Sequence, residues 1–141
     1  MAEKITLKNG TEYMGELVDG IPQGKGTAWY TNGAQYQGEF EKGRRHGKGI
    51  MTWPTGGKYL GDFYQGLRQG RGTYYYSNGH VYEGEFYNNK QNGRGIFTYP
   101  KGKIYIGEFM DCKQEGIGTM YYPDGTTEAG TWEKDNLKER E

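Results

Sequence analysis

The amino-acid sequence predicts an all-β fold, an elongated single-layer antiparallel β-meander built from tandem hairpins. Glycines recur with a fixed period of 23 residues along nearly the whole chain. Between them, short segments place aromatic residues at alternate positions, and turn-forming residues separate these segments. A fixed period of this length indicates a repeat array in which each unit packs on its neighbours.

The first half of each unit has the pattern of a β-strand. Tyrosine, glycine and phenylalanine alternate with other residues, which is the two-residue period of a strand. We therefore expect one strand at each copy of this pattern. The copies are Tyr13–Leu17, Tyr36–Phe40, Tyr59–Phe63, Tyr82–Phe86, Tyr105–Phe109 and the degenerate Glu128–Trp132.

The second half of each unit begins with a Gly-x-Gly pair and continues with aromatic and β-branched residues, a composition typical of strands. Examples are segments 47–53, 70–76 and 93–99. Turn sequences such as Pro54-Thr-Gly56 follow, in which glycine accepts a left-handed conformation. Each unit is therefore predicted to be a strand, a polar loop of about six residues, a second strand and a tight turn.

Charge predicts how the two strands of a unit pair. The first strand carries an acid, such as Glu39, and the second carries a base, such as Lys48. Placing Glu39 opposite Lys48 would favour the pairing by a few tenths of a kcal/mol. The same register puts Tyr36, Phe40 and Met51 on one face of the sheet.

We expect one repeat domain over residues 1–141, because no linker or change in composition divides the chain. A half unit at about 5–10 begins it, and a degenerate unit at 128–134 and a charged tail at 135–141 end it. The unpaired backbone groups of the two end strands favour a homodimer. The full repeats span 13–35, 36–58, 59–81, 82–104 and 105–127.

Composition excludes some classes of partner. Lys+Arg and Asp+Glu are both 18, so the formal net charge is zero, and we expect no nucleic-acid partner. The single cysteine, Cys112, cannot form a disulfide within the chain, so a reducing cytoplasm is the simplest location. No apolar run resembles a signal peptide or a membrane span.

The run Tyr-x-Gly-Glu-Phe, a loop, Gly-x-Gly and then Pro/Asn-x-Gly, repeated every 23 residues, resembles the MORN repeat. The resemblance covers about residues 5–133. Its departures are local: Asn89 and Cys112 replace the loop glycine, and Ile117 replaces the base between the paired glycines. The last copy lacks its Tyr and Glu, which suits a capping role. Choline-binding cell-wall repeats also combine Gly with Trp and Tyr, but they have a shorter period and lack Gly-Glu-Phe.

The resemblance implies a grooved β-meander that serves as a binding and scaffolding module, in some members dimeric and often located at membranes or the cytoskeleton. Some MORN arrays are attached to enzymes such as lipid kinases and lysine methyltransferases. Binding of anionic lipids is proposed for the family, although the neutral composition of this chain does not favour it. We expect a cytoplasmic protein, with membrane or cytoskeletal association as the alternative.

Aromatic and acidic residues that recur at the same positions of each repeat form the first candidate surface. It would be a groove for an extended or helical segment of a partner protein. A single layer cannot cover both of its faces, so some rings should stay open to a partner, and the acids would select basic side chains. The alternative is that the rings pack on glycines as the core. The groove candidates are Tyr36, Phe40, Trp53, Tyr59, Asp62, Phe63, Tyr76, Tyr82, Glu85, Phe86, Tyr99, Tyr105, Glu108 and Phe109.

Bases in and beside the loops form the second candidate surface. They would take anionic phospholipid headgroups or acidic peptides. The alternative is that they are solvated or pair with the column of acids. The candidates for this edge are Arg44, Arg45, Lys48, Arg68, Arg71, Lys90 and Arg94.

The sequence shows no catalytic, cofactor or metal site. His46 and His80 lie far apart without a second ligand at metal-binding spacing, and Cys112 has no Cys or His partner. The Gly-x-Gly pairs are not dinucleotide loops, because no helix is expected after them. We therefore predict a non-catalytic protein-binding scaffold without a cofactor. Two alternatives stay open: a peripheral membrane module that binds anionic phospholipids, and a targeting or regulatory module for a separate enzyme.

Overall fold

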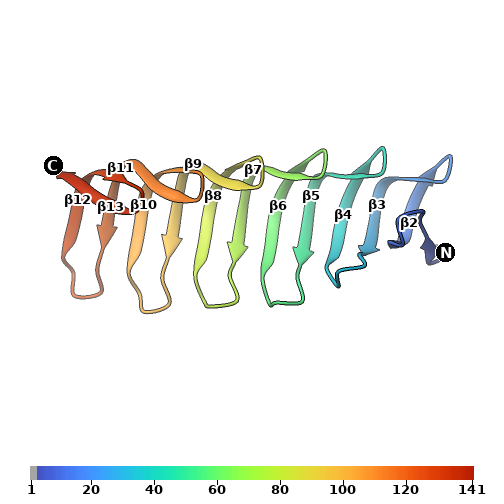
Figure 1. Ribbon diagram of the computed structural model, residues 1–141, viewed down its shortest axis with the longest axis horizontal. Coiled ribbons are helices and arrows are strands. Elements are labelled where there is room, and N and C mark those ends of the chain that lie inside the picture. Colours follow the sequence, from blue (N-terminus) through green and yellow to red (C-terminus); the bar gives the residue numbers. More distant parts are fainter. Residues whose placement is uncertain (1–2) are drawn as a thin grey trace.

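The computed structural model describes residues 3–141, which form one open antiparallel sheet of 13 strands. The strands lie side by side in chain order, without crossovers, and no second layer covers them (Figure 1). No helix occurs among the described residues. The predicted all-β meander of hairpins is confirmed. Its strands are β1 (Ile5–Thr6), β2 (Glu12–Val18), β3 (Ile21–Trp29), β4 (Gln35–Glu41), β5 (Arg44–Thr52), β6 (Lys58–Tyr64), β7 (Leu67–Tyr75), β8 (Val81–Tyr87), β9 (Lys90–Thr98), β10 (Ile104–Met110), β11 (Lys113–Tyr121), β12 (Thr127–Glu133) and β13 (Asn136–Arg140).

A two-residue turn joins the two strands of each repeat, so the predicted polar loop of about six residues is wrong. Between β4 and β5 the turn residues Lys42 and Gly43 have φ angles of 51° and 82°. Two successive left-handed residues are typical of the type I′ turn, whose twist matches that of antiparallel strands. The charged residues expected in a loop continue the strands instead.

The Pro-x-Gly segments form the longer connections, which join one repeat to the next. Residues 53–57 connect β5 to β6. The N–H of Trp53 donates to the carbonyl of Gly57, and the N–H of Gly56 donates to the carbonyl of Trp53, both at 3.0 Å. Gly56 has a φ of 105°, which explains why glycine stands at this point of the turn.

A β-bulge sets the register within each repeat. Gly38 is opposite Gly49, but Phe40 is opposite Arg45, so one residue of β4 faces three residues of β5. The predicted pairing of the Glu39 and Lys48 side chains is therefore corrected. The Glu39 carboxylate accepts a hydrogen bond from the backbone N–H of Lys48 at 2.7 Å, because the bulge removes that N–H from the ladder.

The same carboxylate contact occurs in all five full repeats. Glu16, Asp62, Glu85 and Glu108 accept the corresponding backbone N–H at 2.6–2.9 Å. Across the boundary between repeats, each acid after Glu16 lies opposite a base of the preceding repeat instead of one in its own. These cross-strand pairs are Lys25–Glu39, Lys48–Asp62, Arg71–Glu85 and Arg94–Glu108.

The register gives the sheet two different faces. We call the face that carries the tyrosines and phenylalanines of the first strands the aromatic face. The opposite face, which carries the acids and their cross-strand bases, is the charged face. Because successive residues of a strand point to opposite sides, the two sets do not mix.

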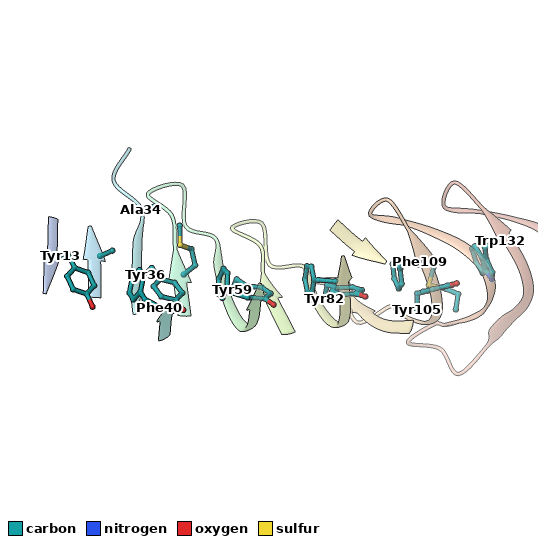
Figure 2. Close-up of a cluster of buried hydrophobic side chains, with 14 residues drawn as sticks. Tyr13, Ala34, Tyr36, Phe40, Tyr59, Tyr82, Tyr105, Phe109 and Trp132 are labelled. Atoms are coloured by element: carbon teal, nitrogen blue, oxygen red, sulfur yellow. The ribbon is translucent and has the colours of Figure 1, made fainter. Parts of the chain in front are cut away.

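The core is a row of rings along the aromatic face (Figure 2). Tyr13, Tyr36, Tyr59, Tyr82 and Tyr105 are fully buried. A phenylalanine packs edge-to-face between the tyrosine of its own repeat and that of the preceding repeat, with ring centroids 5.0–5.2 Å apart. Such pairs contribute about 0.5–1.5 kcal/mol beyond the area they bury. These phenylalanines are Phe40, Phe63, Phe86 and Phe109.

Each buried tyrosine lies over a pair of glycines on adjacent strands. In the third repeat, Tyr59 covers Gly61 of β6 and Gly72 of β7, which are paired across the two strands. Its hydroxyl donates to the carbonyl of Asp62 at 2.8 Å. A Cβ on Gly72 would lie 2.4 Å from that hydroxyl oxygen, so the ring can take this position only over glycine.

Neighbouring repeats are also joined through their turns. The N–H of Gly66 donates to the carbonyl of Arg45 in the preceding repeat at 2.8 Å, and Gly43, Asn89, Cys112 and Asp135 make the equivalent bond in their repeats. Along the upper edge of Figure 1, the hairpin ends accordingly fold over toward their neighbours. At the C-terminal end, the tail expected at 135–141 contributes strand β13, in which Leu137 is opposite Trp132.

We predict that Gly61→Ala lowers the free energy of unfolding by about 1–3 kcal/mol, because the added Cβ overpacks the core. It would lie 2.5 Å from both the carbonyl oxygen of Arg71 and the Cα of Gly72. Gly57→Ala is the matched control, since the nearest atoms to its Cβ would be the Tyr74 hydroxyl oxygen at 3.2 Å and Cε3 of Trp53 at 3.6 Å, both in side chains. Urea unfolding followed by circular dichroism measures both. Equal effects of the two substitutions would show that the glycine pair is not tightly covered.

Candidate functional site

Beyond the buried row, the aromatic face carries a second set of rings that stay half-buried. They come from the second strand of each repeat and from the connection that follows it, and they pack against the edge of the core. No other layer covers them, so part of each ring is open to a partner. We call them the open rings: Tyr30, Trp53, Tyr74, Tyr76, Phe97, Tyr99 and Tyr122.

An open hollow of about 740 Å³ lies among these rings in the N-terminal half of the array. Tyr30, Trp53 and Tyr74 form its aromatic walls, and Arg45 and Arg68 also line it. We call this place the arginine hollow.

The bulge turns both arginines onto the aromatic face. Arg45 is opposite Phe40, and Arg68 is opposite Phe63, so each shares the face of its phenylalanine. The guanidinium of Arg45 lies 5.3 Å from the ring centroid of Tyr30, and its Nη2 donates to the carbonyl of Gly66 at 2.8 Å.

Arg68 repeats this arrangement one hairpin further along. Its guanidinium lies 5.5 Å from the ring of Trp53 and 5.1 Å from that of Tyr74. Its Nη2 donates to the carbonyl of Asn89 at 2.8 Å. The rings thus hold both guanidinium groups in place.

Neutral residues occupy the same position in the C-terminal half. Gln91 and Gln114 are buried, and their Nε2 groups donate to the hydroxyls of Tyr76 and Tyr99, the latter at 2.8 Å. The position opposite the phenylalanine therefore changes from arginine to glutamine between the third and the fourth repeat.

The structure separates the predicted groove residues. The rings of Tyr36, Phe40, Tyr59, Phe63, Tyr82, Phe86, Tyr105 and Phe109 are the core itself, at most 5% exposed, as in the alternative that the rings pack on glycines. Asp62, Glu85 and Glu108 lie on the charged face and bind backbone N–H groups. Rings and acids therefore do not line one groove. Of the predicted set, Trp53, Tyr76 and Tyr99 are the open rings.

Asp62 illustrates how the acids of the charged face are bound within the sheet. Partial burial raises its pKa, but the hydrogen bond from the Lys48 ammonium and that from the N–H of Arg71 outweigh this effect, and the pKa of Asp62 lies below its usual value. The carboxylate is therefore ionised at neutral pH and is already bonded within the chain.

The structure also divides the predicted basic edge. Arg45 and Arg68 belong to the arginine hollow. Arg44 and Lys90 are the first residues after two-residue turns and are exposed. The other three lie on the charged face opposite acids, namely Lys48, Arg71 and Arg94. The seven bases do not form one continuous stripe.

Sequence reasoning missed Tyr30, Tyr74 and Phe97 as open rings, and it assigned both arginines to a loop edge. A signal was present, because Arg45 and Arg68 align with Gln91 and Gln114 in the 23-residue frame. Within residues 3–141, no three His, Cys, Asp or Glu side chains gather where they could hold a metal ion. The described part of the chain also contains no helix long and apolar enough to cross a membrane.

The family model for the MORN repeat matches residues 13–35, 36–58, 59–81, 82–104 and 105–127. This chain belongs to the MORN-repeat family. The matched boundaries are those that the glycine period predicts. No curated protein matches the chain in sequence.

Among solved structures, the MORN array is similar to the TCP domain of SAS-4 (dCPAP) from Drosophila melanogaster, solved in complex with a proline-rich motif of Ana2 (dSTIL). The identity is 16%, the TM-score is 0.52, and the match covers 92% of this chain and 77% of that chain. The wild-type TCP10 domain of CPAP from Danio rerio matches with 17% identity and a TM-score of 0.31, over 92% and 83% of the two chains. At these identities, the first likeness concerns the fold alone.

The buried tyrosines link stability to alkaline pH. Burial raises the pKa of Tyr36, Tyr59 and Tyr82 well above the ordinary value of 10.0, and it raises that of Tyr105 to about 12. A raised pKa means that the folded state keeps its protons when the unfolded state loses them. The stabilisation is therefore complete below pH 10 and is lost as the pH rises from there through the folded pKa.

We predict cooperative alkaline unfolding above about pH 10. Each tyrosine that ionises only after unfolding lowers the free energy of unfolding by up to about 1.4 kcal/mol per pH unit. Tyrosinate absorbance and circular dichroism, recorded along one pH titration, should show a group of tyrosines ionising together with the loss of β-structure. Independent ionisation of all tyrosines near pH 10, with the β-signal intact, would contradict the burial of this row.

Proposed function

We propose that this MORN array is a non-catalytic scaffold that binds a segment of a partner protein on its aromatic face. The observation that carries the proposal is the series of open rings beside the arginine hollow, on a layer that nothing else covers. Aromatic residues and arginine are the residue types enriched in protein interfaces. Because the open rings pack on a fixed core, they can meet a partner without first being ordered.

The Drosophila TCP domain supports this proposal. It has a similar fold, and it was solved with a proline-rich motif of another protein. Grooves lined with aromatic side chains commonly bind such extended segments. We propose the corresponding role, binding of an extended partner segment, for the aromatic face of this chain.

The alternatives have less support. A phospholipid-binding edge needs bases on one surface, whereas the predicted bases lie in three places and three of them are opposite acids. The other alternative, a targeting or regulatory module, would be the same scaffold with a separate enzyme as its partner. The proposed location remains the cytoplasm, where the one exposed cysteine, Cys112, would stay reduced.

We predict that the double variant Trp53→Ala with Tyr99→Ala loses partner proteins that the unmodified chain captures. Truncation of an interface aromatic near the centre of a contact costs about 2 kcal/mol or more. Tyr87→Ala is the matched control, because this ring is 60% exposed and follows Phe86, so it points away from the aromatic face. Affinity capture with mass spectrometry compares the variants, and thermal melting checks that each is folded.

A second arm tests the membrane alternative. Arg44→Glu with Lys90→Glu reverses two exposed bases without touching the open rings, so protein capture should be unchanged. Cosedimentation with phosphatidylserine vesicles measures lipid binding in the same variants. Vesicle binding that only the charge reversal removes, together with unchanged protein capture by the ring variant, would replace the scaffold with the membrane module.

A further inference from the structure

We infer that the arginine hollow recognises two carboxylates on an extended, proline-containing acidic segment of a partner protein. The inference rests on the proposed function, since it states the chemistry of the segment that the aromatic face would hold. It requires that neither arginine has an acidic partner within the chain, that the fold does not need their charge, and that their spacing fits such a segment.

Neither arginine has an acidic partner. The ion pairs among the described residues involve other bases, and neither Arg45 nor Arg68 lies within 4.0 Å of an Asp or Glu oxygen. The nearest rows of acids lie on the charged face, on the far side of the sheet. The two positive charges therefore stand uncompensated beside aromatic rings.

Their hydrogen bonds are also incomplete. The Nε atoms of Arg45 and Arg68 are buried without an acceptor. The Nη1 of Arg45 reaches only the sulfur of Met51, at 3.9 Å, and the Nη1 of Arg68 donates to no described residue. Buried polar groups in proteins normally have partners. Two equivalent guanidinium groups line one open hollow, and no oxygen of the described residues accepts from either Nη1, which points to an acceptor supplied from outside.

The chain itself shows that the fold does not need charge at this position. Gln91 and Gln114 occupy it in the next two repeats and donate to tyrosine hydroxyls. A neutral side chain thus fills the same position, where it bonds to a tyrosine hydroxyl instead of a turn carbonyl. The fold therefore does not require the charge of Arg45 and Arg68 at this position, and the charge is free to act in the hollow. Guanidinium groups bind carboxylates through paired, charge-assisted hydrogen bonds.

The spacing of the arginines selects the shape of the segment. They stand at equivalent positions two strands apart, and strands are spaced about 4.8 Å, so the two groups lie roughly 10 Å apart along the array. A polyproline II segment has three residues per turn and rises about 3.1 Å per residue, which places residues i and i+3 on one side about 9 Å apart. The flat rings of Trp53 and Tyr74 between and beside the arginines suit the prolines of such a segment.

The test uses a fluorescein-labelled polyproline peptide of twelve residues with glutamate at positions 5 and 8, measured by fluorescence anisotropy. We expect Arg45→Gln and Arg68→Gln each to weaken binding about tenfold or more. Both variants copy the glutamine of the later repeats, so the fold should survive, and thermal melting verifies this. Arg71→Gln is the matched control: it removes a base three residues from Arg68 on the charged face and should leave binding unchanged.

Variants of the peptide test separately whether binding depends on the spacing of the two glutamates and on their charge. Glutamates at positions 5 and 6, or glutamines at 5 and 8, should bind about tenfold more weakly than the designed peptide. Tighter binding of a helical peptide with acids seven residues apart would overturn the extended conformation. Binding to phosphatidylserine vesicles that Arg45→Gln and Arg68→Gln abolish, without peptide binding, would overturn the protein segment in favour of lipid.

The outcome also distinguishes this inference from the proposed function. If no acidic peptide binds while capture of a partner still depends on Trp53 and Tyr99, the carboxylate site is refuted and the scaffold stands. If neither the peptide nor any protein depends on the aromatic face, both are refuted.

Discussion

The contact between each buried tyrosine and the glycine pair beneath it is the constraint on which the rest of the structure depends. A single layer has no opposing layer against which to bury side chains, so its core must lie flat on its own backbone. Tyr59 does so by covering Gly61 and Gly72 and by donating to the carbonyl of Asp62. The fixed columns of tyrosine, glycine and acid in the repeat are therefore parts of one packing unit.

Coupling between repeats follows from this unit. Each phenylalanine fits between two successive tyrosines, and every two-residue turn after the first donates to the preceding hairpin, so each repeat depends on its neighbours. The ends depart from the pattern where a neighbour is missing. Leu17 has no tyrosine before it and is 41% exposed, whereas Trp132 closes the row on Tyr105. The array therefore has a regular repeat spacing, and groups at equivalent positions lie at regular distances along it.

The period and the alternation of the sequence were sufficient to predict the meander, its strands and the repeat boundaries. The register beyond the glycine pair could not be predicted in the same way, because Glu39 bonds to the backbone N–H of Lys48 and not to its side chain. That bond accompanies a bulge that charge pairing does not reveal. Two other errors go with the unpredicted bulge. A loop was expected where the strands continue, and Arg45 was assigned to a loop edge although it lies on the aromatic face.

Comparison of the repeats with one another separates structural positions from those free to specify a partner. The tyrosine, the glycine pair and the acid recur because they form the core and bind the bulge in each full repeat, and the acids of the charged face are already bonded to backbone. The position opposite the phenylalanine is under no such constraint, since it holds Pro22, arginine or glutamine in successive repeats while the fold stays the same. It lies on the face whose rings remain open. Variation at this one position can therefore change what the surface binds with little effect on the stability of the sheet. In this chain it places arginines in two successive repeats.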